Sequence, residues 1–197
     1  APNRTPASEL KDWSDGELIR AIREGVHRSG RPLLIMPSEF FRNLSDADVQ
    51  AIVAALRAQP ATSAVSPSTR LNVLGALFIG AGMFPTTAQK PITAPIVAPA
   101  EGASAEYGEY LVSFLACRFC HGENLTGGTP GKKFPPAGPD LPHIVSRWSA
   151  EGFVRTFRTG VDPVQHTLTK AMPWEMYAGF ASDDDLRAIH AYLASRQ

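Results

Sequence analysis

One short motif constrains the fold of this chain more than any other feature. Cys117-Arg118-Phe119-Cys120-His121 places two cysteines, separated by two residues, directly before a histidine. This is the attachment signature of a c-type haem, in which each thiol adds to one vinyl group of the porphyrin. The adjacent histidine is then brought under the iron as an axial ligand. The sequence therefore predicts haem c bound through Cys117, Cys120 and His121.

Two other sites use similar cysteine spacing, and the sequence supports them less well. A thioredoxin-like redox pair is expected within a βαβ pattern, and no such pattern surrounds this motif. A zinc site needs further Cys or His residues at ligand spacing. The chain holds 2 cysteines in all, so no cysteine remains for a structural disulfide either.

Length and charge limit the classes of protein that this chain can belong to. Its 197 residues suffice for one large domain or two smaller ones. The 19 basic and 19 acidic residues leave no basic excess, so nucleic acid is not an expected partner. The 17 prolines and 16 glycines predict long irregular loops. Because no stretch alternates as a strand does, we expect a mainly α fold.

Helical spacing of apolar residues divides the chain into three parts. Residues 1–59 are expected to hold helices that start near Ser14 and Ser45, both plausible N-caps. Residues 60–105 are expected to be a linker, and residues 106–197 the domain with the haem motif. In that domain helices are expected over residues 106–116, 149–158 and 182–195.

An apolar segment lies within the expected linker. Residues 71–84 form a run of fourteen uncharged residues, which is shorter than the roughly 20 needed to span a bilayer. A helix buried between domains is the simpler interpretation. A helix that docks on a partner or lies at a membrane interface is the alternative.

The two ends of the chain resemble each other. Trp13-Ser14 matches Trp148-Ser149, and Met36-Pro37 matches Met172-Pro173, at a nearly constant offset of about 135 residues. Residues 1–59 are therefore expected to be the C-terminal part of a first haem domain. The matching attachment motif would precede Ala1, so either the true start of the chain is missing or an ancestral domain lost it. The retained Met36 favours the first explanation, although Met also fills gaps in cores.

The sixth iron ligand has to come from a distant part of the chain. A methionine thioether is the usual partner of histidine in an electron-carrying haem. Met172, held by Pro173 in an extended loop, is the expected ligand, and Met36 is the candidate for a second haem iron. Met176 is expected only to face the haem edge. His143, His166 and His190 are rival ligands; of these, His190 is expected at the surface of the last helix.

Other side chains are candidates for holding the haem and its ligand. The Pro139 carbonyl is expected to accept a hydrogen bond from His121. The candidates to pair with the haem propionates are Trp148, Arg155 and Arg158. The alternative is that the tryptophan packs in the core and that the two arginines lie on an ordinary exposed helix face.

These features together resemble the class I cytochromes c. The shared marks are the haem motif and four further stretches: Gly108-x-Tyr110, Gly138-Pro139-x-Leu141, Met172-Pro173 and Ala188-Ile189-x-Ala191-Tyr192-Leu193. The pattern over both halves is similar to that of dihaem cytochromes c, the electron-transfer subunits of bacterial dehydrogenases and respiratory complexes. The resemblance implies two tandem cytochrome-like halves, and a close crossing of Gly108 and Tyr110 with Tyr192.

The expected function is electron transfer, because an iron bound by both His and Met has no open position for a substrate. The alternatives are a haem enzyme or gas sensor with an exchangeable site, and a structural subunit docked through residues 71–84. A positive rim of Arg118, Lys132, Lys133 and Arg147 is expected to steer an acidic redox partner. Covalent haem attachment takes place outside the cytoplasmic membrane, which predicts a periplasmic site or the outer face of that membrane, beside a membrane-associated complex. No basic segment followed by an apolar run opens the given sequence, so we expect it to be processed or incomplete at its start.

Overall fold

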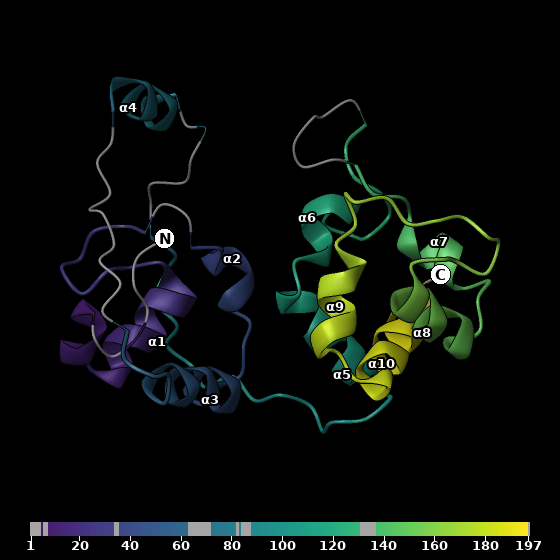
Figure 1. Ribbon diagram of the computed structural model, residues 1–197, viewed down its shortest axis with the longest axis horizontal. Coiled ribbons are helices and arrows are strands. Elements are labelled where there is room, and N and C mark those ends of the chain that lie inside the picture. The colour runs from purple at the N-terminus through teal and green to yellow at the C-terminus, as the bar shows by residue number, and fades with distance from the viewer. Residues whose placement is uncertain are drawn as a thin grey trace. The chain divides into compact units, whose positions relative to one another are not determined.

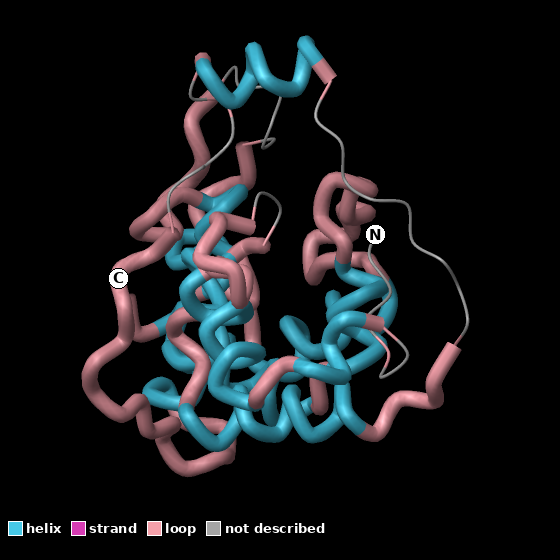
Figure 2. Tube along the Cα trace, turned by 90° about the vertical axis from the view of Figure 1, so that its left-hand side faces the viewer, coloured by secondary structure: helices cyan, strands magenta, loops and turns pink. Residues whose placement is uncertain are grey.

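The chain forms two compact units, Ala1–Val97 and Ala98–Gln197, called unit 1 and unit 2 below (Figure 1). The computed structural model describes residues 5, 8–33, 36–62, 72–81, 83, 88–130 and 137–196. Helices and loops make up all of these residues, apart from isolated β-bridges (Figure 2). The expectation of a mainly α fold is confirmed for the described residues.

Unit 1 is built on two helices that pack against each other, α1 (Asp15–Glu24) and α3 (Asp46–Arg57). Both begin after an N-cap serine whose hydroxyl accepts a backbone N–H of the first turn. This bond is the reason why serine is favoured at the N-cap. The short elements of this unit are η1 (Glu9–Asp12), α2 (Ser38–Phe41) and α4 (Val73–Gly80). Its core consists of Trp13, Leu18, Ala21, Ile22, Val26, Leu44, Val49 and Val53.

The segment that follows α4 returns to unit 1. The Gln89 N–H donates to the Glu24 carbonyl at 2.9 Å, and the Asp46 N–H donates to the Ile96 carbonyl at 2.8 Å. Part of the region expected to be a linker therefore lies on α1 and the start of α3.

The apolar helix α4 is exposed. Val73 is 80% exposed, Leu77 63% and Phe78 37%, and no residue of α4 is buried. The simpler interpretation of residues 71–84, a buried helix, is therefore wrong for the part of that segment that the structure describes. No helix among the described residues has the length and apolar character needed to cross a bilayer.

Unit 2 is organised around its last helix, α10 (Asp183–Ala194), which packs on α5 (Ala105–Phe114), α7 (Leu141–Val145) and α8 (Ala150–Thr159). Two shorter helices, α6 (Cys117–His121) and α9 (Trp174–Phe180), complete it. The core residues come mainly from α5, α8 and α10: Leu111, Val112, Leu125, Val145, Phe153, Val154, Ala181, Leu186, Ala188, Ile189, Tyr192 and Leu193.

Gly108 sets the distance between α5 and α10. A Cβ added at Gly108 would lie 1.9 Å from the carbonyl oxygen of Ala188 and 2.9 Å from Cβ of Tyr192. Only a residue without a side chain fits there, and this close approach is the crossing that the resemblance implied for Gly108 and Tyr192. The ring of Tyr110 lies 5.1 Å from that of Phe114, measured between centroids.

The two units repeat the same local contacts. A left-handed glycine ends α1 (Gly25, φ 67°) and α8 (Gly160, φ 71°), and the carbonyl of each accepts a backbone N–H at 2.7 Å. In unit 1 the Arg23 guanidinium binds Asp46 at 2.7 Å, and in unit 2 Arg158 binds Asp183 at 2.7 Å. Each aspartate is the first residue of the unit's last long helix.

Candidate haem site

His121 ends α6 and is held in one orientation. Its side chain is buried, and Nδ1 lies 2.8 Å from the Pro139 carbonyl oxygen, the contact expected from the sequence. Because a carbonyl can only accept, Nδ1 carries the proton. Burial lowers the pKa of His121, and the bond to Pro139 opposes this shift. The imidazole is therefore neutral at pH 7, with the lone pair of Nε2 available for a metal.

A glycine makes room for this ring. A Cβ at Gly138 would lie 2.6 Å from Nδ1 and Cε1 of His121. The Gly138 N–H donates to the Cys120 carbonyl at 2.8 Å, and the Gly138 carbonyl accepts from Gly128 at 3.0 Å. These bonds hold the loop of Gly138 and Pro139 directly against α6, where only glycine fits.

The surroundings of the two cysteines favour the neutral thiol. Both are free and partly exposed by surface area, but burial of the sulfur raises the pKa of Cys117 to about 11, and burial raises that of Cys120 also. A reactive redox pair needs the opposite shift, toward the thiolate. Among the described residues no group of three or more His, Cys, Asp or Glu is placed to hold a metal ion. The residues therefore fit a haem bound by two thioethers and one imidazole better than a redox pair or a zinc site.

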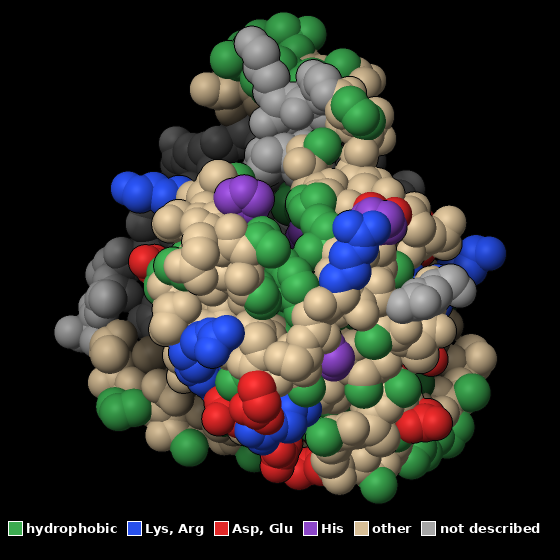
Figure 3. All heavy atoms as spheres, turned by 90° about the vertical axis from the view of Figure 1, so that its right-hand side faces the viewer, with side chains coloured by type: hydrophobic (Ala, Val, Ile, Leu, Met, Phe, Trp, Pro, Cys, Tyr) green, Lys and Arg blue, Asp and Glu red, His purple; other side chains and the backbone are tan. Residues whose placement is uncertain are grey.

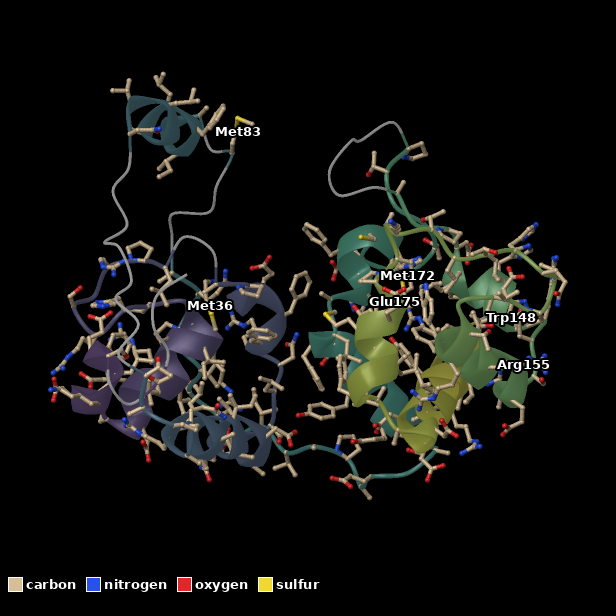
Figure 4. The ribbon with its side chains drawn as sticks, viewed as in Figure 1. Met36, Met83, Trp148, Arg155, Met172 and Glu175 are labelled. Carbon is tan, nitrogen blue, oxygen red and sulfur yellow. The ribbon has the colours of Figure 1, made fainter. Side chains whose placement is uncertain are left out.

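Met172 lies two residues before the start of α9 (Figure 4). Its N–H donates to Thr169 at 2.9 Å, and its carbonyl accepts from Trp174 at 2.8 Å, so the turn around Pro173 fixes its backbone. Its side chain is half-buried, whereas Met176 is 57% exposed. Met36 of unit 1 is half-buried too, and its carbonyl accepts the N–H of Ser38 at 2.8 Å in the same manner.

The three rival histidines have partners elsewhere. His143 is exposed, with Nε2 2.9 Å from Arg147, and His166 is exposed, with Nδ1 3.4 Å from Asp162. His190 was expected at the surface, but it is half-buried and its Nε2 lies 2.8 Å from the Trp148 carbonyl. It thus links α10 to Trp148, two residues before α8, a contact that the sequence did not indicate.

The residues considered for propionate binding differ in their surroundings. Figure 4 shows Trp148 and Arg155 along the edge of unit 2 away from α6. Trp148 is half-buried beside the core, and Arg155 is exposed on α8. Arg158 donates to Asp183 at 2.7 Å and to the carbonyls of Ala178 and Ala181 at 2.8 and 2.7 Å. These bonds assign Arg158 to the contact of α8 with α9 and α10 rather than to a propionate.

The expected positive rim is only partly described. Lys132 and Lys133 lie outside the described residues. Arg118 is half-buried and donates to the Tyr192 hydroxyl at 3.3 Å, while Arg147 is exposed beside His143. On the face of the molecule seen in Figure 3, basic side chains are interspersed with acidic ones. No continuous basic rim is therefore apparent on that face among the described residues.

Tyr177 is a site residue that the sequence did not single out. Its hydroxyl donates to the Leu115 carbonyl at 2.8 Å, just before the haem motif. Burial first, and then the two cysteines, raise its pKa, so the hydroxyl keeps its proton. Tyr177 follows Met172 by five residues, as Phe41 follows Met36, which marks an aromatic position in the sequence but indicates no role for the hydroxyl.

Comparison with known proteins gives a consistent group of relatives. Residues 103–193 match the family described as cytochrome c oxidase, cbb3-type, subunit III. A nicotinate dehydrogenase subunit of Pseudomonas putida is 32% identical over 96% of this chain, a match that spans both units. The cytochrome c subunit of a quinone-type alcohol dehydrogenase from Gluconobacter oxydans is 31% identical over 48% of the chain. The cytochrome c subunit of gluconate 2-dehydrogenase from Pantoea cypripedii is 33% identical over 48%.

The chain spans only a small part of these relatives: 17% of the first, 22% of the second and 23% of the third. The family match, over residues 103–193, lies entirely within unit 2.

Proposed function

Since residues 103–193 form a c-type cytochrome domain, which binds haem c covalently, we propose that unit 2 carries single electrons through a haem held by His121 and Met172. Cys117 and Cys120 provide the two thioether links. The observation that carries the proposal is the buried imidazole of His121, whose Nδ1 is fixed by Pro139 so that Nε2 is the nitrogen with the lone pair.

The protein's part in this function is to hold the iron ligands in place and to limit the access of other molecules to the iron. When bound, the haem supplies an iron that changes oxidation state by one electron. Pro139 and Gly138 keep the His121 ring from turning, and the turn at Pro173 keeps Met172 in place. With His121 and Met172 both bound to it, the iron would offer no position to a substrate, and the chain would act as a carrier rather than as a haem enzyme or gas sensor.

The proposed partners are the other subunits or domains of an oxidoreductase. All three relatives are named as subunits of dehydrogenases, and two of them as cytochrome c subunits. We place this chain beside such a dehydrogenase, where it passes electrons on toward a membrane-associated respiratory complex. We place it in the periplasm or at the outer face of the cytoplasmic membrane, because covalent haem attachment takes place there.

A redox titration of the haem-loaded chain tests the carrier role. A single reversible one-electron wave for unit 2, with rapid reduction by one-electron mediators, is the expected result. Spectra recorded along the titration should keep the six-coordinate form of both the ferric and the ferrous iron. Turnover of peroxide, or a substrate-dependent change in the haem spectrum, would favour a haem enzyme.

We propose that unit 1 is the back part of a second cytochrome domain, with Met36 as its iron ligand. Arg23, Gly25 and Met36 make the same local contacts as Arg158, Gly160 and Met172, as described above. On α3, Ala51 and Ala55 are exposed and Ile52 is 38% exposed. Their counterparts on α10 are buried beneath α5: Ala188, Ile189 and Tyr192, at 0, 6 and 4% exposure. A helix of the α5 kind, carrying a haem motif, would cover this face.

The mass of the natural protein under denaturing conditions counts the covalent haems. One haem is lost when Cys117 and Cys120 are both changed to Ala, because these links belong to unit 2. We expect one further haem to remain in the natural protein if a front segment completes unit 1. A haem-free double variant would contradict the second-haem proposal and leave the one for unit 2 intact.

A further inference from the structure

We propose that Tyr177 is a positioning residue that ties the Met172 side of the haem site to the His121 side through its hydroxyl. The inference rests on the proposed function of unit 2. Its basis is the bond from the Tyr177 hydroxyl to the Leu115 carbonyl, 2.8 Å long, between residues 62 positions apart in the chain.

Both ends of this bond adjoin the ligands. Tyr177 lies in α9, which begins two residues after Met172. Leu115 is the C-cap of α5, and Ala116 follows in the left-handed conformation (φ 59°) to start α6 at Cys117. The last carbonyls of a helix have no partner within that helix, so the Tyr177 hydroxyl satisfies one of them at the entrance to the haem motif.

The bond joins two parts of unit 2 that otherwise pack on different helices. α6 packs mainly against α5, whereas α9 packs mainly against α8. The Tyr177 ring is itself fixed: its centroid lies 6.1 Å from that of Phe157, edge to face, and 5.7 Å from that of Phe180. A fixed ring with a hydroxyl bonded across the site limits how far Met172 can move from His121.

The internal repeat distinguishes the ring of Tyr177 from its hydroxyl. Phe41 occupies the position in unit 1 that Tyr177 occupies in unit 2, between the methionine-proline pair and the last long helix. The aromatic ring is present in both units. Of these two positions only that in unit 2 carries a hydroxyl, and there the Leu115 carbonyl accepts its hydrogen bond.

Exchange of the methionine ligand for imidazole tests the inference. In the haem-loaded full chain, added imidazole competes with Met172 for the ferric iron, and the haem spectrum reports its binding. Tyr177→Phe keeps the ring and removes one hydrogen bond. We expect it to raise the rate of imidazole binding roughly three- to tenfold, the range that the net value of one hydrogen bond gives.

Tyr192→Phe is the matched control. It removes a phenol hydroxyl from the same unit, where that hydroxyl contacts Glu109 and Arg118 at 3.3 Å, and leaves the Leu115 bond in place. Its imidazole rate should equal that of the wild type. An unchanged rate in Tyr177→Phe, or an equal rise in both variants, would overturn the inference. If the wild type itself binds imidazole as fast as Met172→Ala does, the proposed Met172 ligation fails instead.

Discussion

A Gly108→Ala variant is expected to unfold at a much lower denaturant concentration than the wild type, with a loss of about 2–3 kcal/mol in the free energy of unfolding. Alanine in place of glycine inside a helix normally stabilises by about 1 kcal/mol. Here the new methyl group would lie 1.9 Å from the backbone carbonyl of Ala188, so α5 and α10 must move apart. Because this contact supports the core of unit 2, the substitution is expected to lower the free energy of unfolding instead of raising it.

Gly179→Ala is the control for this prediction. Gly179 also lies in a helix of unit 2, and nothing lies within 4 Å of the position of its added Cβ. We expect Gly179→Ala to be neutral or slightly stabilising in the same denaturant titration, followed by circular dichroism. Equal midpoints for the two variants would mean that the crossing of α5 and α10 tolerates a side chain at position 108.

Replacement of Met172 by Ala is expected to have the largest effect on the haem. The variant loses its sulfur ligand, which favours the ferrous iron, so the reduction potential should fall by on the order of 100 mV. The same change opens a coordination position, and the reduced variant should bind carbon monoxide. Redox titration and the absorption spectrum of the reduced protein measure the two effects.

Met176→Ala provides the comparison. Met176 follows Met172 by four residues, but its side chain is 57% exposed. We expect this variant to keep the wild-type potential and to remain closed to carbon monoxide. If Met176→Ala opens the iron and Met172→Ala does not, the ligand assignment is reversed.

Features set by nearby residues could be predicted from the sequence. Ser14, Ser45 and Ser182 each cap a helix through a contact three residues away, and all three helices start where expected. The contact of His121 with Pro139 could also be predicted, because the haem motif and the Gly138-Pro139 pair can each be recognised in the sequence. Such features depend on short stretches of chain.

Features set by tertiary contacts were not predictable in this way. Apolar composition alone suggested a buried helix at residues 71–84, but burial also requires a partner surface, and α4 is exposed. The sequence offered Arg158, like Arg155, only as a candidate to pair with a haem propionate. Its bonds to Asp183 and to two carbonyls come from residues at least 20 positions further along the chain.

The addition of carbon monoxide to the reduced, haem-loaded wild-type chain tests the central claim most directly. That claim is an iron closed on both sides by His121 and Met172. The absorption spectrum of the reduced protein is predicted to stay unchanged when carbon monoxide is added. A shift to the spectrum of a carbon monoxide complex would show an exchangeable position and contradict the electron-carrier account.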